Sequence, residues 1–443
     1  MVAALTVLVK LAGMGKESLV AQAFGASAPL DAFLLALQIV GYLFTFVAGS
    51  LTAAFIPAYV RVRHERGGEE AGRLLGSVVL VIGGMGIAAA LVLMACSGLL
   101  WQALGQRLGP EAGADIQTVF WILSAIPLLG CVSAVWGSTL NAHGQFAIPA
   151  AATLAIPLVT ALAVALFAPQ WGIVALAAGT TCGFAGEMAI LGIGLRRQGV
   201  PLRPGWHGWN EPLRQIRDQA APLLFGAALV NANPLVDQAL AAALGPAGSV
   251  SALSYANKIP AAMQGILVIS VGAVMLPHFS SQVALQDWRG VRATLRRWSL
   301  WLLLLTLPAM AALIGLSTIV VRLLFEHGQF TAADTQLVGQ VQIFYLLQVP
   351  CYVVGMLGVR LLNALQGNRI VAAIGCVNVI VNVVGDLLLF RLFDRLGLPG
   401  IAGIALSTAV VYLISMLLIF TAIATRLRSL ERENGERPIN PRS

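Results

Sequence analysis

The stretch Lys10-Leu11-Ala12-Gly13-Met14-Gly15-Lys16-Glu17 places three ionisable groups inside an apolar segment that begins at Val2. Counting about 1.5 Å per residue from Val2 puts Lys10 roughly 12 Å and Lys16 roughly 21 Å deep in a hydrocarbon core about 30 Å thick. Charges at such depth cost at least about 2.5 to 3.5 kcal/mol each and normally face a polar cavity. The stretch therefore predicts a membrane helix that lines a substrate or ion path.

The composition around this helix is typical of a polytopic helical membrane protein. The 443 residues are 58% hydrophobic and 10% charged, with a mean hydropathy of +0.85. The apolar runs are too long and too unalternating for open sheets or a membrane barrel, so we expect an all-α helix bundle. A net charge of +8 would suggest nucleic acid in a soluble protein. Here the positions of the basic residues matter more than their sum, and we expect no nucleic-acid partner.

Twelve apolar runs predict the spans 2–24, 31–60, 74–100, 116–140, 148–167, 173–195, 220–244, 250–282, 298–321, 336–363, 370–390 and 401–424. With the N-terminus inside, nineteen arginines lie on the cytoplasmic side, against four outside, Arg107, Arg322, Arg391 and Arg395. This bias predicts that both termini are cytoplasmic. The first span lacks the pattern of a cleavable signal peptide, so we expect it to be retained.

Two charged segments flank the later spans. The basic stretch 285–301 carries Trp288, Trp298 and Trp301 and predicts an interfacial helix at the inner leaflet, although a simple anchored loop also explains it. The tail from Arg426 to Ser443 is charged and rich in proline near its end, and we expect it to be disordered.

The chain contains an internal repeat with an offset near 220 residues. Asp31 to Pro57 matches Ser251 to Pro277 in length, and Leu140-Asn141-Ala142 is echoed by Leu362-Asn363-Ala364. Six spans in each half give both halves the same orientation, with a pseudo-two-fold axis along the membrane normal and a site between the halves. We expect a six-helix lobe at 1–195, a cytoplasmic linker at 196–219, a second six-helix lobe at 220–424 and a cytoplasmic tail at 425–443.

Four basic residues lie within or at the ends of spans and form the candidate substrate site: Lys10, Lys16, Lys258 and Arg360. Lys10 and Glu17 share a helix face, and Lys16 points about 100° away. Gly13 and Gly15 favour a bend or a tight helix contact. A cationic lining from both halves suits phosphate or diphosphate. The alternative is a mutually neutralised Lys/Glu pair that only packs helices.

Acidic and amide side chains form a second set. Asp31 is either a cavity residue or an N-cap at the outer surface. Asp237 follows Pro234, which frees a backbone carbonyl, and Asn382 and Asp386 share one helix face at i and i+4. Oxygen ligands on two helices predict a cation site, with sodium as the possible coupling ion. Interhelical hydrogen bonding is the simpler alternative.

The sequence gives no sign of an enzyme. It has no GxxxxGK[ST] motif for ATP, no Ser/His/Asp or Cys/His grouping, and its five cysteines and five histidines lack metal-ligand spacing. We therefore expect a membrane transporter without a catalytic centre, a bound cofactor or an ATP-driven step.

Several motifs in order resemble one family across nearly the whole chain. They are 10–17 followed by Val20-Ala21, Phe24-Gly25-Ala26 and Asp31-Ala32-Phe33, then 248–258, 324–335 and 402–408. In these segments the chain resembles the MurJ/MviN lipid II flippases of the MOP exporter superfamily, which also includes the MATE transporters.

The resemblance implies a two-lobed bundle whose central cavity alternates between membrane faces. It would move an undecaprenyl-diphosphate-linked saccharide, a lipid II-like peptidoglycan precursor, across the bacterial inner membrane. Carried over by position, the polar cavity residues are Lys10, Lys16, Asp31, Ser251, Lys258 and Arg360. The positions that bind sodium in some members are Asp237, Asn382, Asp386 and Thr408.

The chain also departs from the family pattern. Arginine is usual where it has Lys10, Lys16 and Lys258, and Leu43, Phe44 and Thr45 stand near the place of two expected arginines. Members commonly have fourteen spans rather than twelve. A polyprenyl-linked exopolysaccharide or O-antigen repeat unit is therefore an alternative substrate. A cation-coupled multidrug exporter and a transport-inactive scaffold are two competing functions. We expect a monomer in the lipid bilayer.

Overall fold

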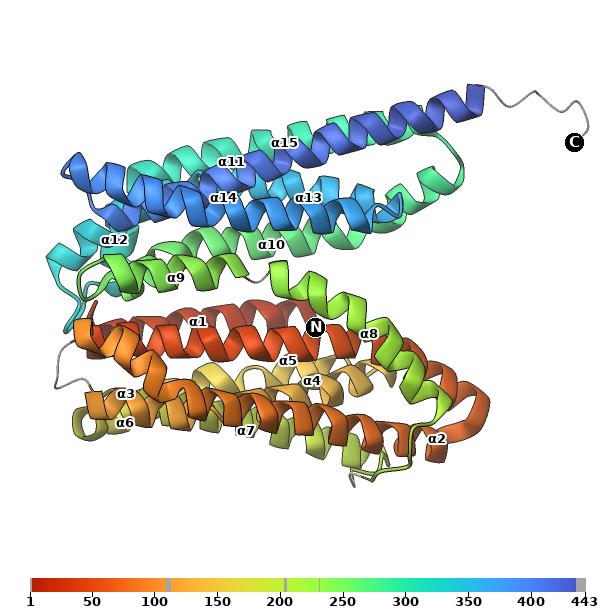
Figure 1. Ribbon diagram of the computed structural model, residues 1–443, viewed down its shortest axis with the longest axis horizontal. Coiled ribbons are helices and arrows are strands. Elements are labelled where there is room, and N and C mark those ends of the chain that lie inside the picture. The colour runs from red at the N-terminus through yellow and green to blue at the C-terminus, as the bar shows by residue number, and fades with distance from the viewer. Residues whose placement is uncertain (1, 109–112, 203–204, 231, 436–443) are drawn as a thin grey trace, which may run out of the picture. The chain divides into compact units, whose positions relative to one another are not determined.

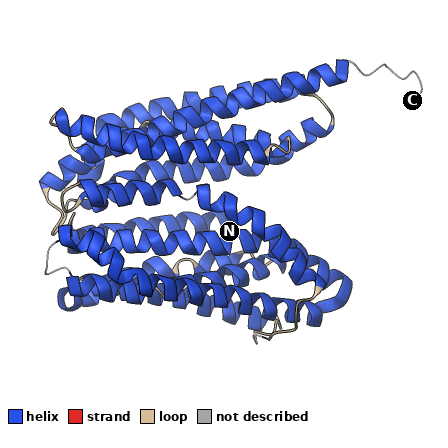
Figure 2. Cartoon of the chain, viewed as in Figure 1, coloured by secondary structure: helices blue, strands red, loops and turns tan. Residues whose placement is uncertain are grey.

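The computed structural model describes residues 2–108, 113–202, 205–230 and 232–435, and every regular element in these ranges is a helix (Figures 1 and 2). The predicted all-α class is confirmed. The helices are α1 (Val2–Phe24), α2 (Ala28–Leu108), α3 (Gly113–Leu123), α4 (Ile126–Ala142), α5 (Ala147–Ala152), α6 (Ala155–Trp171), α7 (Ile173–Arg197), α8 (Glu211–Val230), α9 (Ala232–Leu244), α10 (Ser249–Ala284), α11 (Trp288–Phe325), α12 (Ala332–Leu346), α13 (Gln348–Ala364), α14 (Asn368–Arg395) and α15 (Gly400–Gly435).

Eight helical stretches in the described ranges are long and apolar enough to cross a membrane. One of them, Ala28–Ala95, is 68 residues long. It contains a break at Gly67, whose φ of 87° and ψ of 177° are not helical. At about 1.5 Å per residue this stretch is long enough for two crossings of a core about 30 Å thick. The chain is thus a multi-pass membrane protein, and the count of twelve spans stays a prediction.

Several predicted spans are each divided into two helices just before a proline. Pro127, Pro157, Pro234 and Pro350 all lie within the first three residues of α4, α6, α9 and α13. A proline has no N–H for the helix ladder, and its ring clashes with the carbonyl one turn back, so the ladder stops where proline fits best, in a first turn. Pro57, Pro260 and Pro308, in contrast, lie inside continuous helices.

The chain forms two compact units, which are described separately. The first contains residues 1–251 and 324–334. Within it, α2 packs against α4, α8 and α9, α6 packs against α7, and α1 packs against α5 and α6. Its core includes the fully buried rings of Phe55 and Tyr59.

The second unit contains residues 252–323 and 335–443. Here α15 packs against α13 and α14, and the core includes Phe279, Val349 and Leu361. The units follow spatial contacts, whereas the predicted lobes follow the sequence repeat, so the lobe boundaries stay a prediction.

Three flanking segments differ from the sequence-based expectations. The predicted interfacial helix in 285–301 is wrong, because α11 runs without a break from Trp288 to Phe325. The predicted linker at 196–219 includes the first turns of α8. The prediction of a disordered tail is wrong for 426–435, which continue α15, and residues 436–443 lie outside the described residues.

The tail is helical because its apolar stripe continues past the predicted end of the span. Ile419, Ile423 and Leu427 are spaced by four residues and are at most 4% exposed. Leu430 packs against the same cluster. This spacing places all four on one helix face. The apolar spacing is visible in the sequence, but the many charged residues between these positions led to the prediction of disorder.

Candidate functional site

The predicted site begins on α1, where Lys16 and Glu17 form an ion pair. Lys16 Nζ lies 2.6 Å from a Glu17 carboxylate oxygen, and the two side chains are 21% and 16% exposed. Lys10 is exposed and has no ion-pair partner among the described residues. Lys16 is thus neutralised by Glu17 in this conformation, whereas the charge of Lys10 stays uncompensated.

The two glycines between the lysines face open space. A Cβ added at Gly13 or Gly15 would meet no atom within 4 Å, and α1 is one continuous helix. The expected tight helix contact at these glycines is therefore wrong, and the expected bend stays a prediction. Since α1 packs against α5 and α6 elsewhere on its surface, the glycines leave room beside Lys16.

Gly15→Ala tests whether the open space beside Gly15 is needed for transport. Because nothing occupies the space and alanine favours the helix by about 1 kcal/mol over glycine, we expect a slightly higher melting temperature together with slower transport. Gly183→Ala is the contrasting variant, since its Cβ would lie 2.7 Å from the Ile156 Cα and should lower the melting temperature. Transport at the wild-type rate with Gly15→Ala would show that the space is not used.

Asp31 forms several hydrogen bonds with the start of α10 in the first unit. Its carboxylate accepts hydrogen bonds of 2.7 Å from the Gly248 N–H, the Ser251 N–H and the Ser251 hydroxyl. Asp31 is 3% exposed and Ser251 is fully buried. The carboxylate therefore caps the start of α10, where free N–H groups and the helix dipole favour a negative charge. An N-cap of its own helix is wrong, because α2 begins three residues earlier, at Ala28.

Three glycines with positive φ surround this contact and allow close backbone approach. A Cβ on Gly25 would lie 2.5 Å from the Gln329 carbonyl oxygen, and one on Gly248 would lie 2.7 Å from the Ala26 carbonyl oxygen. The Gln329 N–H also donates to the Gln22 carbonyl at 2.9 Å. A Cβ on Gly328 would clash with the same Gln22 carbonyl oxygen. The loop 326–331 thus joins the turn between α1 and α2, a contact that sequence reasoning did not find.

In the second unit, Lys258 and Arg360 lie at different levels. Asn257, next to Lys258, accepts a 3.1 Å hydrogen bond from the buried Gln348 at the start of α13. Arg360 instead lines a small cavity with Val268 and Val271 of α10. These valines follow Lys258 by ten and thirteen residues, which is about 15 to 20 Å along a helix. Lys258 and Arg360 thus lie at different levels of the second unit, and their role in a cationic lining stays a prediction.

Two of the four predicted sodium ligands, Asn382 and Asp386, contact each other on α14, and a third, Thr408, lies on α15, which packs against α14. Asn382 and Asp386 of α14 are fully buried, and the Asn382 amide donates to Asp386 at 3.5 Å. The neighbouring Ser407 hydroxyl of α15 donates to the Asn382 carbonyl at 3.4 Å. Thr408 is 7% exposed and donates to the Ile404 carbonyl at 3.2 Å.

The fourth predicted ligand, Asp237, belongs to the first unit and is 6% exposed. Pro234 lies in the first turn of α9, so the carbonyl that it leaves without a donor is that of Val230, at the end of α8. Among the described residues, no group of three or more His, Cys, Asp or Glu side chains could hold a metal ion.

Comparisons with known proteins agree with this architecture. A family model described as "Lipid II flippase MurJ" matches residues 20–435. A probable lipid II flippase MurJ of Synechocystis is 26% identical over 442 residues, covering 97% of this chain and 81% of that protein. The lipid II flippase MurJ of Burkholderia cenocepacia is 26% identical over 457 residues, covering 96% and 83%.

Two solved structures share the fold. A lipid II flippase MurJ in an inward closed conformation matches with a TM-score of 0.79 and 22% identity, covering 96% of this chain and 87% of that chain. An inward-facing multidrug resistance MATE family transporter of the MOP superfamily matches with a TM-score of 0.77 and 12% identity, covering 96% and 99%. At these identities the structural matches bear on the fold alone.

Proposed function

We propose that this chain, which belongs to the lipid II flippase MurJ family, translocates a polyprenyl-diphosphate-linked saccharide of the lipid II type across the bacterial inner membrane. The observation that carries the proposal is the family match over residues 20–435. The charged face of α1, where Lys10 is exposed and two glycines face open space, supports it. The chain acts by alternating access, as a transporter rather than an enzyme.

The lysines hold the diphosphate in this proposal. An ammonium group is a compact point charge that binds phosphate without the two-point geometry of a guanidinium. Lys10 is available, whereas Lys16 must exchange its contact with Glu17 for one with the headgroup. Glu17 thus acts as an internal competitor that lets the headgroup leave again after translocation. Lys258 and Arg360 are the basic candidates of the second unit.

Asp31 and Ser251 have a positioning role in this proposal. In this conformation the Ser251 N–H and hydroxyl both donate hydrogen bonds to the Asp31 carboxylate. Both residues become available to the headgroup only when the start of α10 separates from α2. Their bond therefore stabilises the state in which neither is exposed.

Sodium is the proposed coupling ion. The carboxylate of Asp386, the amide oxygen of Asn382 and the hydroxyl of Thr408 are the oxygen ligands that a hard cation prefers, so the donor set fits. A bound cation offsets the charge of Asp386, which is otherwise costly to bury.

Asp386→Asn tests this cation site. The variant keeps the shape of the side chain and removes its charge, so we expect it to abolish the dependence of the transport rate on sodium. Asp394→Asn, at the end of the same helix, is the matched control and should keep that dependence. Equal sodium dependence in the wild type and in Asp386→Asn would exclude a role for this carboxylate in coupling.

The orientation belongs to the same proposal. The excess of arginine in the predicted cytoplasmic segments favours both termini on the cytoplasmic side. The headgroup then enters from the cytoplasm and leaves on the outer face of the membrane.

The alternative substrate is a polyprenyl-linked exopolysaccharide or O-antigen repeat unit, which carries the same diphosphate. Lysine in place of the family's usual arginine favours it, because lysine specifies the phosphate geometry less tightly. A cation-coupled drug exporter shares the fold. The basic side chains of α1 argue against it, since a cationic drug would be repelled.

Complementation separates these functions. We expect expression of this chain to restore growth and cell shape to a bacterium depleted of its lipid II flippase, and we expect Lys16→Arg to restore them better than Lys16→Ala. Restoration of O-antigen export, without rescue of the depleted strain, would favour the alternative substrate. Rescue of drug resistance alone would contradict both flippase functions.

A further inference from the structure

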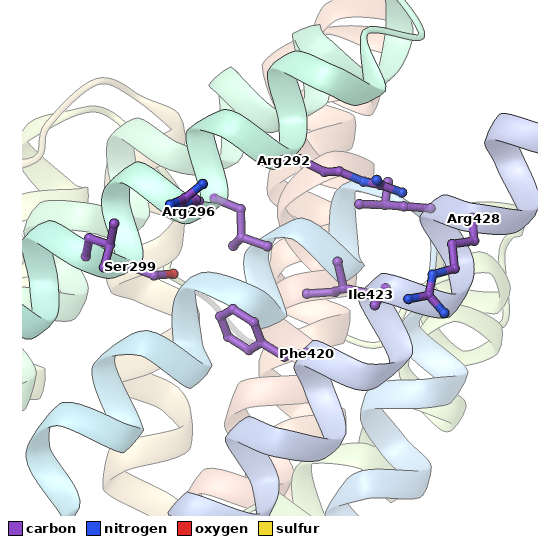
Figure 3. A pocket seen from close by; sticks show the side chains of 10 residues that line it. Arg292, Arg296, Ser299, Phe420, Ile423 and Arg428 are labelled. Atoms are coloured by element: carbon purple, nitrogen blue, oxygen red, sulfur yellow. The ribbon is translucent and has the colours of Figure 1, made fainter.

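A cavity of about 450 Å³ lies between the start of α11 and the end of α15 (Figure 3). This size is in the range of pockets that hold small ligands. Arg292, Arg296 and Arg428 contribute guanidinium groups from the two helices, and Phe420 and Ile423 of α15 line the same cavity. The cavity belongs to the second unit and shares no residue with the predicted substrate site.

The charge in this cavity is only partly compensated. Arg292 forms a 2.7 Å ion pair with Glu431, which links the two helices. Arg296 and Arg428 are exposed and have no acidic partner within 4 Å in the described part of the chain. Two positive charges are therefore available to an anion. Arginine is suited to bind phosphate oxygens through two parallel N–H groups.

The rest of the lining is apolar and continues onto the exposed sides of the helices. Leu300 lines the cavity and is 56% exposed, and Leu304, one turn further along α11, is 64% exposed. On α15, Leu417 is 53% exposed. In a membrane protein such side chains face acyl chains. An occupant of this cavity thus meets a cationic end and a lipid-facing apolar end.

The tryptophans place this cavity at the level of the lipid headgroups. Trp298 and Trp301 are both exposed on the same turns of α11 as Arg296 and Leu300. Tryptophan gathers where hydrocarbon meets water, and clusters of basic residues on the cytoplasmic side attract anionic lipids. With the predicted orientation, this level is that of the inner leaflet.

From this geometry we infer that the cavity binds an anionic phospholipid of the inner leaflet. The lipid's phosphodiester lies between Arg296 and Arg428, and the first part of an acyl chain lies against Phe420, Ile423 and Leu300. The bound lipid fastens the end of α15 to the start of α11. This site does not depend on the proposed flippase function, because its occupant is a bulk membrane lipid.

Lipid titration of the purified full-length chain, followed by native mass spectrometry, tests the inference. We expect phosphatidylglycerol to be retained in preference to phosphatidylethanolamine. With about 1 kcal/mol per basic residue near an anionic lipid surface, the variant Arg296→Gln/Arg428→Gln should bind phosphatidylglycerol about thirtyfold more weakly. Ala424→Trp, which fills the exposed wall of the cavity and keeps both arginines, should reduce binding similarly without lowering the melting temperature.

The matched control is Arg297→Gln/Arg432→Gln, which removes the same charge from the same two helices outside the cavity. We expect it to keep the wild-type preference. Equal retention by all variants, or an equal loss in the control, would overturn the site. Displacement of phosphatidylglycerol by millimolar inorganic phosphate would indicate a simple anion site and overturn the lipid assignment. Tighter binding of a polyprenyl diphosphate than of phosphatidylglycerol would assign the cavity to the substrate and overturn the inference as well.

Discussion

Asp31→Ala is expected to lower the free energy of unfolding by about 3 to 5 kcal/mol, because it leaves the buried N–H groups of Gly248 and Ser251 without their acceptor. It also leaves the Ser251 hydroxyl to donate to the Gly248 carbonyl, 3.0 Å away. In the wild type, all three donate to this one carboxylate at 2.7 Å. Hydrogen bonds to a charged group contribute more than neutral ones, and the donors left behind cannot reach water. The melting temperature followed by tryptophan fluorescence in detergent measures the effect.

Two further variants control this prediction. Asp31→Asn keeps one acceptor but turns an NH₂ group toward a backbone N–H, so its melting temperature should lie between those of the wild type and Asp31→Ala. Asp218→Ala removes an exposed carboxylate that forms an ion pair with its neighbour Arg217 and should change stability by less than about 1 kcal/mol. If Asp31→Ala melts at the wild-type temperature, the carboxylate does not hold the start of α10.

Lys16→Ala is expected to slow headgroup translocation in proteoliposomes by about tenfold to a hundredfold. A charge-assisted bond to a diphosphate contributes about 1.5 to 3 kcal/mol, and each 1.4 kcal/mol corresponds to a factor of ten. Lys16→Arg keeps the charge and should retain most of the rate. Lys258→Ala should show a similar loss, since it removes the corresponding charge of the second unit.

The control for this prediction is Arg197→Gln, an exposed charge in the last turn of α7. It removes a basic residue outside the predicted site and should leave the rate unchanged. The unfolding temperature of each variant separates lost function from lost fold. Wild-type rates for both Lys16→Ala and Lys258→Ala would exclude these lysines from headgroup binding.

Much of the fold could be predicted from the sequence, because the hydrocarbon core allows few solutions. Long apolar runs can only be helices there, and the break at Gly67 falls in the polar stretch expected between the second and third spans. The division of helices before Pro127 and Pro350 was not predicted. A proline is compatible both with a kinked helix and with a new first turn, and the surrounding packing decides between them.

The candidate site was predictable in its residue types but not in its pairings. Asp31 and Ser251 were both singled out, yet their mutual bond spans 220 positions and leaves no local trace in the sequence. Lys16 was expected to point away from Glu17, but its long side chain reaches the neighbouring carboxylate. Arg360 was grouped with Lys258 by charge alone. Its position on α13, beside Val268 and Val271 of α10, became apparent only in the structure.

Translocation of a headgroup-labelled lipid II by the purified chain in liposomes is the direct measurement of the proposed flippase function. In the presence of sodium and a membrane potential, the protein should expose the label on the opposite face much faster than protein-free liposomes do. A rate equal to that of protein-free liposomes, obtained with folded and correctly inserted protein, would contradict the assignment of this chain as a lipid II flippase.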